Sequence, residues 1–128
     1  MEVHRSVFPH CEKNVTEKQF EIFTSASFYN PELDMIVVAS DGKFAAFSTF
    51  RMDPVSGIVE LEPVGTHPNH QKLGLASAAI SEGLQHLKKY KPILVCSSGA
   101  AATPAANRLY DSLGFSQKME IHQWQKKL

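Results

Sequence analysis

The sequence predicts an α/β fold of the α+β type, with a mixed, mostly antiparallel sheet flanked by helices. In some segments apolar residues recur every three or four positions, and in others they form short β-branched runs, which are the patterns of helices and strands. Asp41-Gly42 separates two of these runs and is a strong β-hairpin signal. No repeat, low-complexity segment or long linker divides the 128 residues, so we expect one domain over residues 1–128.

The first half of the chain is predicted to form one helix and three antiparallel strands. A capping-type start at Thr16 begins a helix to about residue 27, and Asn30-Pro31 ends it. Turns are expected at Asp41-Gly42 and at Asp53 to Gly57. The predicted strands cover residues 35–39, 43–51 and 58–66.

The second half changes to helical periodicity. A helix is predicted from about Leu73 to Tyr90, and Pro92 stops it. Residues 93–96 form a short apolar run, expected to pair in parallel with the strand at 58–66 if the crossover is right-handed. Thr103 is placed to cap a helix that has Pro104 at its first position and ends at Gly114. Residues 115–124 are predicted to form a last strand.

The turn from Gln71 to Ala76 joins a strand directly to a helix and is therefore a candidate anion site. The first backbone N–H groups of a helix lack intrahelical partners, and the helix dipole adds about half a positive charge there. A pyrophosphate can bind such a site without a basic side chain. Gly74 and Ala76 are small enough to let a ligand approach the backbone closely.

Composition argues against several partners. Thirteen basic residues balance thirteen acidic ones, so we expect neither nucleic acid nor an anionic membrane as a partner. No apolar segment is long enough for a signal peptide or membrane span, and we expect a cytoplasmic protein. Cys11 and Cys96 are then predicted to be free thiols. No metal site is expected, because His67 and His70 have no cysteine or carboxylate at ligand spacing.

Three motifs in the expected order resemble the GNAT superfamily of acetyl-CoA-dependent N-acetyltransferases. They are Thr66-His67-Pro68 at a strand end, Gln71-x-x-Gly74-x-Ala76, and Asn107-x-x-Tyr110-x-x-x-Gly114-Phe115. The similarity covers about residues 34 to 118. It implies acetyl-CoA as the cofactor and transfer of the acetyl group to a primary amine that attacks the thioester directly.

The resemblance also implies which residues bind the cofactor. The strand at 58–66 is expected to splay from the next parallel strand at a bulge, which Pro63 fits because it has no N–H for a ladder. The pantetheine arm is then expected to lie along Val64, Gly65 and Thr66, with the Val64 N–H polarising the thioester carbonyl. Asn107 matches a residue that hydrogen-bonds this arm. The residues matched to the pyrophosphate turn are Gln71, Lys72, Leu73, Gly74, Leu75 and Ala76.

Three side chains are candidates for proton transfer. Glu60 and Glu62 alternate with Leu61 on a strand and so face the same side, and the family position for a base falls on Glu60. Either carboxylate can accept the amine proton, directly or through water. The alternatives are a solvated strand face or a role limited to attracting a cationic acceptor. Tyr110 matches the family tyrosine that protonates the departing thiolate, the alternative being a packing aromatic.

The chain also departs from the family pattern. It lacks the usual first strand and has room for one strand after Gly114, and this short form resembles the C-terminal half of a tandem acetyltransferase. Residues 3–8, or another chain in a homodimer, are then needed to cover the open edge at residues 35–39. A non-catalytic CoA-binding or regulatory half-module is therefore the second hypothesis. The acceptor is expected to be a small-molecule or peptide amine, and the fold does not specify which one.

Overall fold

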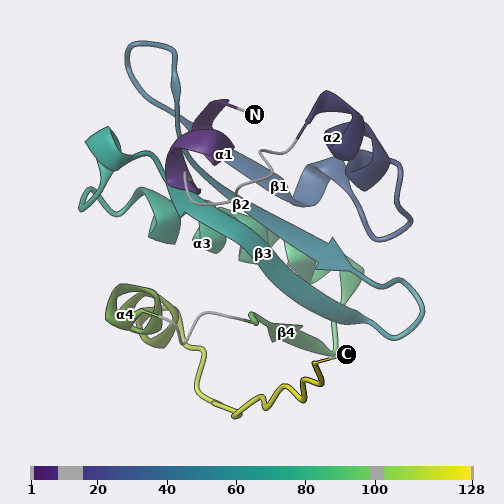
Figure 1. Ribbon diagram of the computed structural model, residues 1–128. Coiled ribbons are helices and arrows are strands. Elements are labelled where there is room, and N and C mark those ends of the chain that lie inside the picture. Colours follow the sequence, from purple (N-terminus) through teal and green to yellow (C-terminus); the bar gives the residue numbers. More distant parts are fainter. Residues whose placement is uncertain (1, 9–15, 99–102, 128) are drawn as a thin grey trace.

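A four-stranded sheet forms the centre of the computed structural model, which describes residues 2–8, 16–98 and 103–127 (Figure 1). The strands lie in the order β1-β2-β3-β4. The first three are antiparallel and β4 is parallel to β3, so the predicted mixed, mostly antiparallel sheet is confirmed. The strands are β1 (Asp34–Val38), β2 (Phe44–Met52), β3 (Ile58–Thr66) and β4 (Leu94–Cys96).

Helices α2 (Glu17–Thr24) and α4 (Pro104–Ser112) begin at the predicted caps. Thr16 and Gln19 form a reciprocal capping box at the start of α2, and the Thr103 hydroxyl accepts from the Ala106 N–H at the start of α4. None of the helices described is long and apolar enough to cross a membrane. The α-helices are α1 (Glu2–Val7), α2 (Glu17–Thr24), α3 (Leu75–Leu87) and α4 (Pro104–Ser112), and the 3-10 helices are η1 (Pro31–Leu33), η2 (Pro68–His70) and η3 (Lys88–Tyr90).

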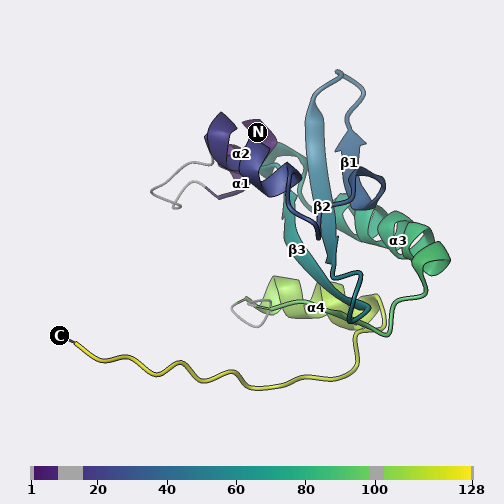
Figure 2. The same ribbon diagram turned by 90° about the vertical axis from the view of Figure 1, so that its right-hand side faces the viewer.

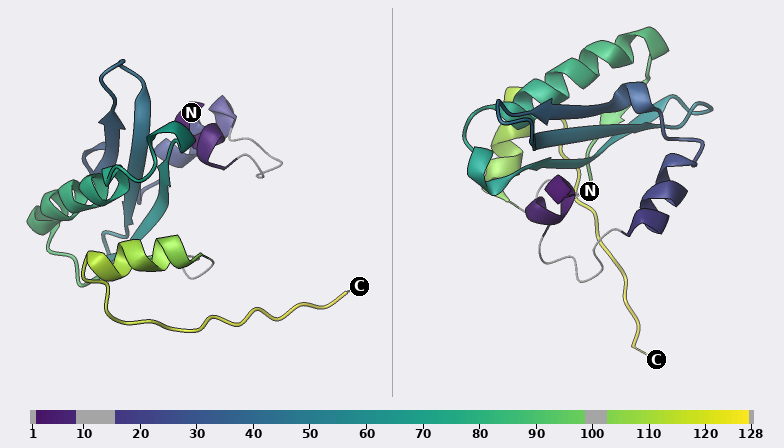
Figure 3. Two further views of the ribbon diagram at one scale, coloured as in Figure 1. Left: turned by 90° about the vertical axis from the view of Figure 1, so that its left-hand side faces the viewer. Right: turned by 90° about the horizontal axis from the view of Figure 1, so that it is seen from above.

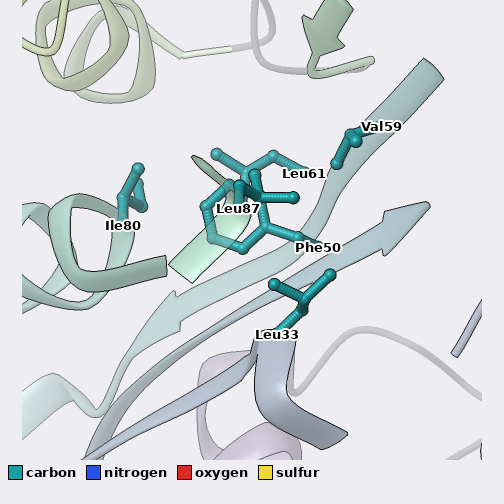
Figure 4. Close-up of a cluster of buried hydrophobic side chains, with 6 residues drawn as sticks. All are labelled: Leu33, Phe50, Val59, Leu61, Ile80 and Leu87. Atoms are coloured by element: carbon teal, nitrogen blue, oxygen red, sulfur yellow. The ribbon is translucent and has the colours of Figure 1, made fainter. Parts of the chain in front are cut away.

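Helices cover both faces of the sheet. Helix α3 lies along one face, α1 and α2 lie on the other, and α4 lies on the β4 side of β3 (Figures 2 and 3). Between α3 and the sheet is a cluster of side chains that are at most 1% exposed (Figure 4). Its members are Leu33, Phe50, Val59, Leu61, Ile80 and Leu87. The apolar stripe of α3 thus fixes the helix, and with it the turn that precedes it, against the sheet.

One expectation about the sheet edges is wrong. Residues 115–127 contain no strand, so the strand predicted at 115–124 is wrong (Figure 1). Alternating polar and apolar residues suit a strand, but pairing needs a neighbour, and Met119, Ile121 and Trp124 are 85%, 78% and 97% exposed. Among residues 2–8 and 16–33 no strand precedes β1, and helices α1 and α2 stand there instead. Helix α1 packs on the sheet face, where Val7 lies over Gly65, and so does not cover the β1 edge.

A charged contact joins η1 to η3, which directly follows α3. The Lys89 ammonium and the Tyr90 hydroxyl both donate to one carboxylate oxygen of Glu32. The hydrogen bond from Lys89, followed by that from Tyr90, holds the pKa of Glu32 below its usual 4.5. The same contact raises the pKa of Lys89 above 10.5. Both partners therefore favour their charged forms in the folded chain.

This contact predicts a pH-dependent stability difference. Glu32→Gln should lower the free energy of unfolding at neutral pH relative to wild type. The difference in the free energy of unfolding between wild type and variant should be largest between about pH 4.5 and 10.5. It should disappear as the pH falls through the lowered pKa of Glu32, or as the pH rises through the raised pKa of Lys89. Urea unfolding of both chains from pH 2 to 7 measures the acid limb. A stability difference that does not change with pH would contradict the ion pair between Glu32 and Lys89. Because the two residues interact, Lys89→Gln should cause little further loss of stability in the Glu32→Gln variant.

Candidate functional site

Strand β3 contains a bulge at Glu62-Pro63. Ser48 of β2 lies opposite Val64, whereas Phe50 lies opposite Leu61. Two residues of β3 therefore face the single residue Thr49, which is the definition of a β-bulge. The bulge that Pro63 predicts is present. Because it inserts one residue, Leu61 and Val64 both contact the core on the α3 face.

Beyond the bulge, β3 has one unpaired side. Its parallel pairing with β4 ends at Glu60, opposite Cys96. The N–H of His67 donates to the carbonyl oxygen of Ala45 at 2.8 Å, and hydrogen-bonded pairs alternate along an antiparallel ladder. Val64 and Thr66 are therefore in non-hydrogen-bonded pairs with β2. Their backbone N–H and C=O groups point away from β2, toward the side on which β4 has ended.

The turn at residues 71–74 leads into α3 through two left-handed residues. Lys72 has φ 63° and Gly74 has φ 73°. Gly74 is the N-cap of α3 and provides no side-chain cap, and the first helical bond runs from the Ala78 N–H to the Gly74 carbonyl. The N–H groups of Leu75, Ala76 and Ser77 thus have no intrahelical partner. A Cβ built on Gly74 would have nothing within 4 Å, so the backbone there is open to a ligand.

Glu60 and Glu62 face the same side of the sheet, as predicted, and share two partners. Arg51 Nη2 lies 2.9 Å from Glu60 Oε2 and 3.2 Å from Glu62 Oε2. The Ser98 hydroxyl donates to Glu60 Oε1 at 2.6 Å and lies 3.4 Å from Glu62 Oε2. Arg51 also lies 6.0 Å from the centre of the Phe28 ring. The carboxylates are therefore held together in one charged cluster.

Sequence reasoning missed Arg51 and Ser98. The hairpin turn between β2 and β3 places Arg51 directly opposite Glu60, so the pairing register was a signal that could have found it. Ser98 follows β4 and comes close to Glu60 only because β4 is parallel to β3. No local pattern in the sequence indicates that approach.

The two α4 residues have different surroundings. Tyr110 is half-buried, packs on the core cluster and meets Phe115 edge-on at 5.2 Å between ring centres. Within the described part of the chain its hydroxyl has no hydrogen-bond partner and is not bonded to either glutamate. The side-chain amide of Asn107 donates to the Thr103 carbonyl at 2.9 Å. The structure thus brings Glu60 and Glu62 together, but it does not join Tyr110 or Asn107 to them.

Cysteine and metal chemistry are limited in the described residues. Cys96 is a free thiol at the end of β4, and Cys11 lies outside the described residues. No three or more His, Cys, Asp or Glu side chains in residues 2–8, 16–98 and 103–127 are grouped to hold a metal ion.

The chain is similar in sequence to acetyltransferases. Residues 1–115 match the model of the family described as Acetyltransferase (GNAT) family. Mycothiol acetyltransferase of Paenarthrobacter aurescens (strain TC1) is 29% identical over 106 residues, which are 80% of this chain and 33% of that protein. The chain thus spans about a third of the length of this relative.

Solved acetyltransferase structures have the same fold. The ribosomal-protein-S18-alanine N-acetyltransferase from Escherichia coli matches with a TM-score of 0.69 and 22% identity, over 88% of this chain and 66% of that one. AAC(6')-Iy, in complex with the bisubstrate analog CoA-S-monomethyl-acetylneamine, matches with a TM-score of 0.77 and 17% identity, over 99% and 88% of the two chains. These likenesses concern the fold alone.

Proposed function

The chain belongs to the GNAT acetyltransferase family, and we propose that it transfers an acetyl group from acetyl-CoA to a primary amine, which attacks the thioester directly. The observation that carries this proposal is the unpaired side of β3 beyond the bulge. Val64 and Thr66 present a row of backbone donors and acceptors there, and the open turn before α3 follows in the same chain segment. An extended ligand can bind such an edge as an added strand.

The residues present fit acetyl-CoA. The free N–H groups at the start of α3, together with the turn from Gln71 to Gly74, suit a pyrophosphate, and Gly74 leaves room for it. The backbone of Val64 to Thr66 would hold the pantetheine arm, with Asn107 as a further hydrogen-bonding residue. When bound, the cofactor supplies an acetyl group activated as a thioester.

Glu60 and Glu62 would remove a proton from the ammonium group of the amine substrate. A lysine-like amine has a pKa of about 10, so it is protonated at neutral pH and cannot attack until it loses a proton. Glu60 or Glu62 takes that proton, directly or through a water molecule. Arg51 and Ser98 hold both carboxylates in place, so the carboxylate that takes the proton has a fixed position.

Two further groups would act on the thioester. The Val64 N–H, which points away from β2, donates to the carbonyl oxygen on which negative charge develops. The Tyr110 hydroxyl gives its proton to the sulfur that leaves. Its lack of a hydrogen-bond partner among the described residues leaves it available for this role.

A second function is a CoA-binding module without acetyl transfer. The observation that favours it is the extended segment at residues 115–127, which forms no strand and so provides no wall beside β4 (Figure 1). Such a module would keep the turn before α3 and the free edge of β3, but it would lack a complete acceptor site. Binding and transfer must therefore be measured separately.

Tyr110→Phe is the variant that tests the proposed transfer. In a thiol-release assay with acetyl-CoA and an amine panel, it should lower kcat by about 10²-fold, since general acid–base catalysis contributes at least that much. Binding of CoA should be unchanged, because only the hydroxyl is removed. Tyr90→Phe, which removes a hydroxyl from η3, is the matched control and should keep the wild-type kcat.

Thermal unfolding with and without CoA separates the two functions. A ligand at about 100 times its dissociation constant adds some 2.7 kcal/mol to stability, so a clear rise in Tm is expected. A rise in Tm without amine-dependent thiol release would favour the binding module. An unchanged Tm at saturating CoA would contradict both functions.

A further inference from the structure

A cavity of about 580 Å³ lies on the sheet face opposite α3, where α1 and α2 approach β1 and β2. Its walls include Phe20 and Phe23 of α2 and Phe44 and Phe47 of β2. The volume is within the range of about 300–1,000 Å³ that small-molecule sites occupy. Phe20 and Phe44 are 42% and 48% exposed, so apolar surface here faces solvent rather than the core. Most of the lining is aromatic or aliphatic, which suits an apolar ligand.

One carboxylate in the cavity is held in a defined orientation. Asp34 Oδ2 accepts from the Tyr29 hydroxyl at 2.9 Å, and Oδ1 accepts from the Thr49 hydroxyl at 2.7 Å. Burial, with the hydrogen bond to Asp34 adding to it, raises the pKa of Tyr29 to about 12, so this hydroxyl remains a donor at neutral pH. In the described part of the chain no cationic side chain forms a salt bridge with Asp34.

The other polar residues of the cavity do not neutralise this charge. His4 lines the cavity and stacks on Phe47 at 5.7 Å between ring centres. Burial lowers the pKa of His4 below its usual 6.5 and so favours the neutral imidazole. Gln19 is uncharged. The cavity therefore combines apolar walls with one carboxylate that forms no salt bridge within residues 2–8, 16–98 and 103–127, an environment that attracts a cation.

The cavity also reaches the proposed reaction site. Pro63, which lies between Glu62 and Val64 in the bulge, is part of its lining. Asp34 pairs with Thr49, and Thr49 faces the bulge, so the carboxylate and the bulge lie in line across neighbouring strands. Neighbouring strands are about 4.8 Å apart, so the backbone at Asp34 on β1 and the bulge on β3 are separated by roughly 10 Å. A ligand in the cavity can thus extend to the carbonyl that the proposed reaction requires.

We propose that this cavity is the acceptor site and that it selects primary amines carried on an aromatic or similarly apolar body. This inference rests on the proposed acetyl transfer. The apolar body occupies the space between the phenylalanines, Asp34 supplies the negative potential that draws the ammonium in, and the amine reacts at the Pro63 end. Polyhydroxylated polyamines are disfavoured, because the cavity offers few partners for their polar groups.

Binding of 2-phenylethylamine to the full chain without acetyl-CoA is the first test. Titration calorimetry should show binding that Phe20→Ala weakens about tenfold, which corresponds to the loss of about 1.4 kcal/mol of apolar contact. Ile22→Ala is the matched control, since Ile22 is on the same helix, is 61% exposed and does not line the cavity. The wild type should bind the amine more tightly than 2-phenylethanol, and Asp34→Asn should remove that preference. No binding to the wild type, or equal loss in Phe20→Ala and Ile22→Ala, would overturn the inference.

Thiol release separates this inference from the proposed function. The kcat/KM for 2-phenylethylamine should exceed those for ethanolamine and for the aminoglycoside sisomicin, and Phe20→Ala should raise KM for the aromatic amine with little change in kcat. If ethanolamine or sisomicin is the better substrate, the acceptor assignment is overturned while acetyl transfer stands. If 2-phenylethylamine binds with the predicted variant pattern but no amine releases thiol, the ligand class is supported while the proposed transfer fails.

Discussion

Replacing both Glu60 and Glu62 with glutamine is expected to lower kcat for amine acetylation by about 10²- to 10⁴-fold, the range that general acid–base catalysis contributes. Glutamine keeps the size of the side chain and an oxygen that can accept from Arg51, but it cannot take the proton of the ammonium. The measurement is single-turnover thiol release across pH 6 to 10. At high pH, where the amine is already deprotonated, the variant should recover part of its rate.

The single variants Glu60→Gln and Glu62→Gln show whether one carboxylate or both act as the base. If Glu60 is the base, Glu60→Gln should reproduce most of the loss, while Glu62→Gln should not. Two small effects would indicate that a water held by both carboxylates carries the proton. Glu120→Gln, in the exposed C-terminal segment, is the charge-matched control. An unchanged kcat in the double variant, with folding and CoA binding retained, would rule out a catalytic role for this pair.

Phe50→Ala is expected to lower the free energy of unfolding by about 3–5 kcal/mol, as is typical of a buried aromatic residue replaced by alanine. Phe50 is completely buried in the cluster between the sheet and α3 (Figure 4). This loss is large against a typical stability of about 5–15 kcal/mol. Urea unfolding monitored by circular dichroism measures it. A loss below about 1 kcal/mol would show that the cluster repacks around the vacated space.

The same ring explains why α3 has a glycine at position 83. A Cβ built on Gly83 would lie 2.1 Å from Phe50 Cε2, which is too close for both atoms to stay in place. Gly83→Ala should therefore cost about 1–3 kcal/mol through overpacking, although alanine gains about 0.8–1.0 kcal/mol of helix propensity. In the Phe50→Ala background the methyl group enters the vacated space, and the substitution should be neutral or stabilising.

The double-mutant cycle thus predicts a favourable coupling of about 0.5–3 kcal/mol between positions 50 and 83. Ala78→Gly, at an exposed position of the same helix, measures helix propensity alone and serves as the control. Additive effects at positions 50 and 83 would contradict the close packing of α3 on β2. Such a result would also question how firmly the turn before α3 is positioned.

Much of the fold could be predicted from local patterns. The β3 bounds agree with the prediction at both ends, and Thr16 and Thr103 cap their helices as expected. Helix α2 ends at Thr24 rather than near residue 27, because the hydroxyls of Thr24 and Ser25 bond to carbonyls of the preceding turn. Such hydroxyls compete with the helix for its own backbone groups. Errors of this kind concern the ends of elements, not their order.

The candidate site was predictable only in part. The alternation of Glu60 and Glu62 and the bulge at Pro63 follow from the strand pattern and from a missing N–H. Arg51 and Ser98, which hold the two carboxylates, required the pairing register of three strands. The cavity required more, because α1, α2 and β2 contribute its walls from separate parts of the chain.

The sequence alone thus determined helices α2, α3 and α4, strands β1 to β4, the bulge and the open helix start before α3, because period, capping and turn chemistry act between residues that are close in the chain. Only the tertiary structure decided that α1 lies on the sheet face, that residues 115–127 remain unpaired, that Arg51 and Ser98 hold the glutamates, and that Asp34 faces a cavity walled by phenylalanines. These features depend on which surfaces meet across long separations in the chain. Hydrophobic burial and strand pairing decide which distant segments pack together, and they act over the whole molecule. A short segment of sequence therefore does not contain this information.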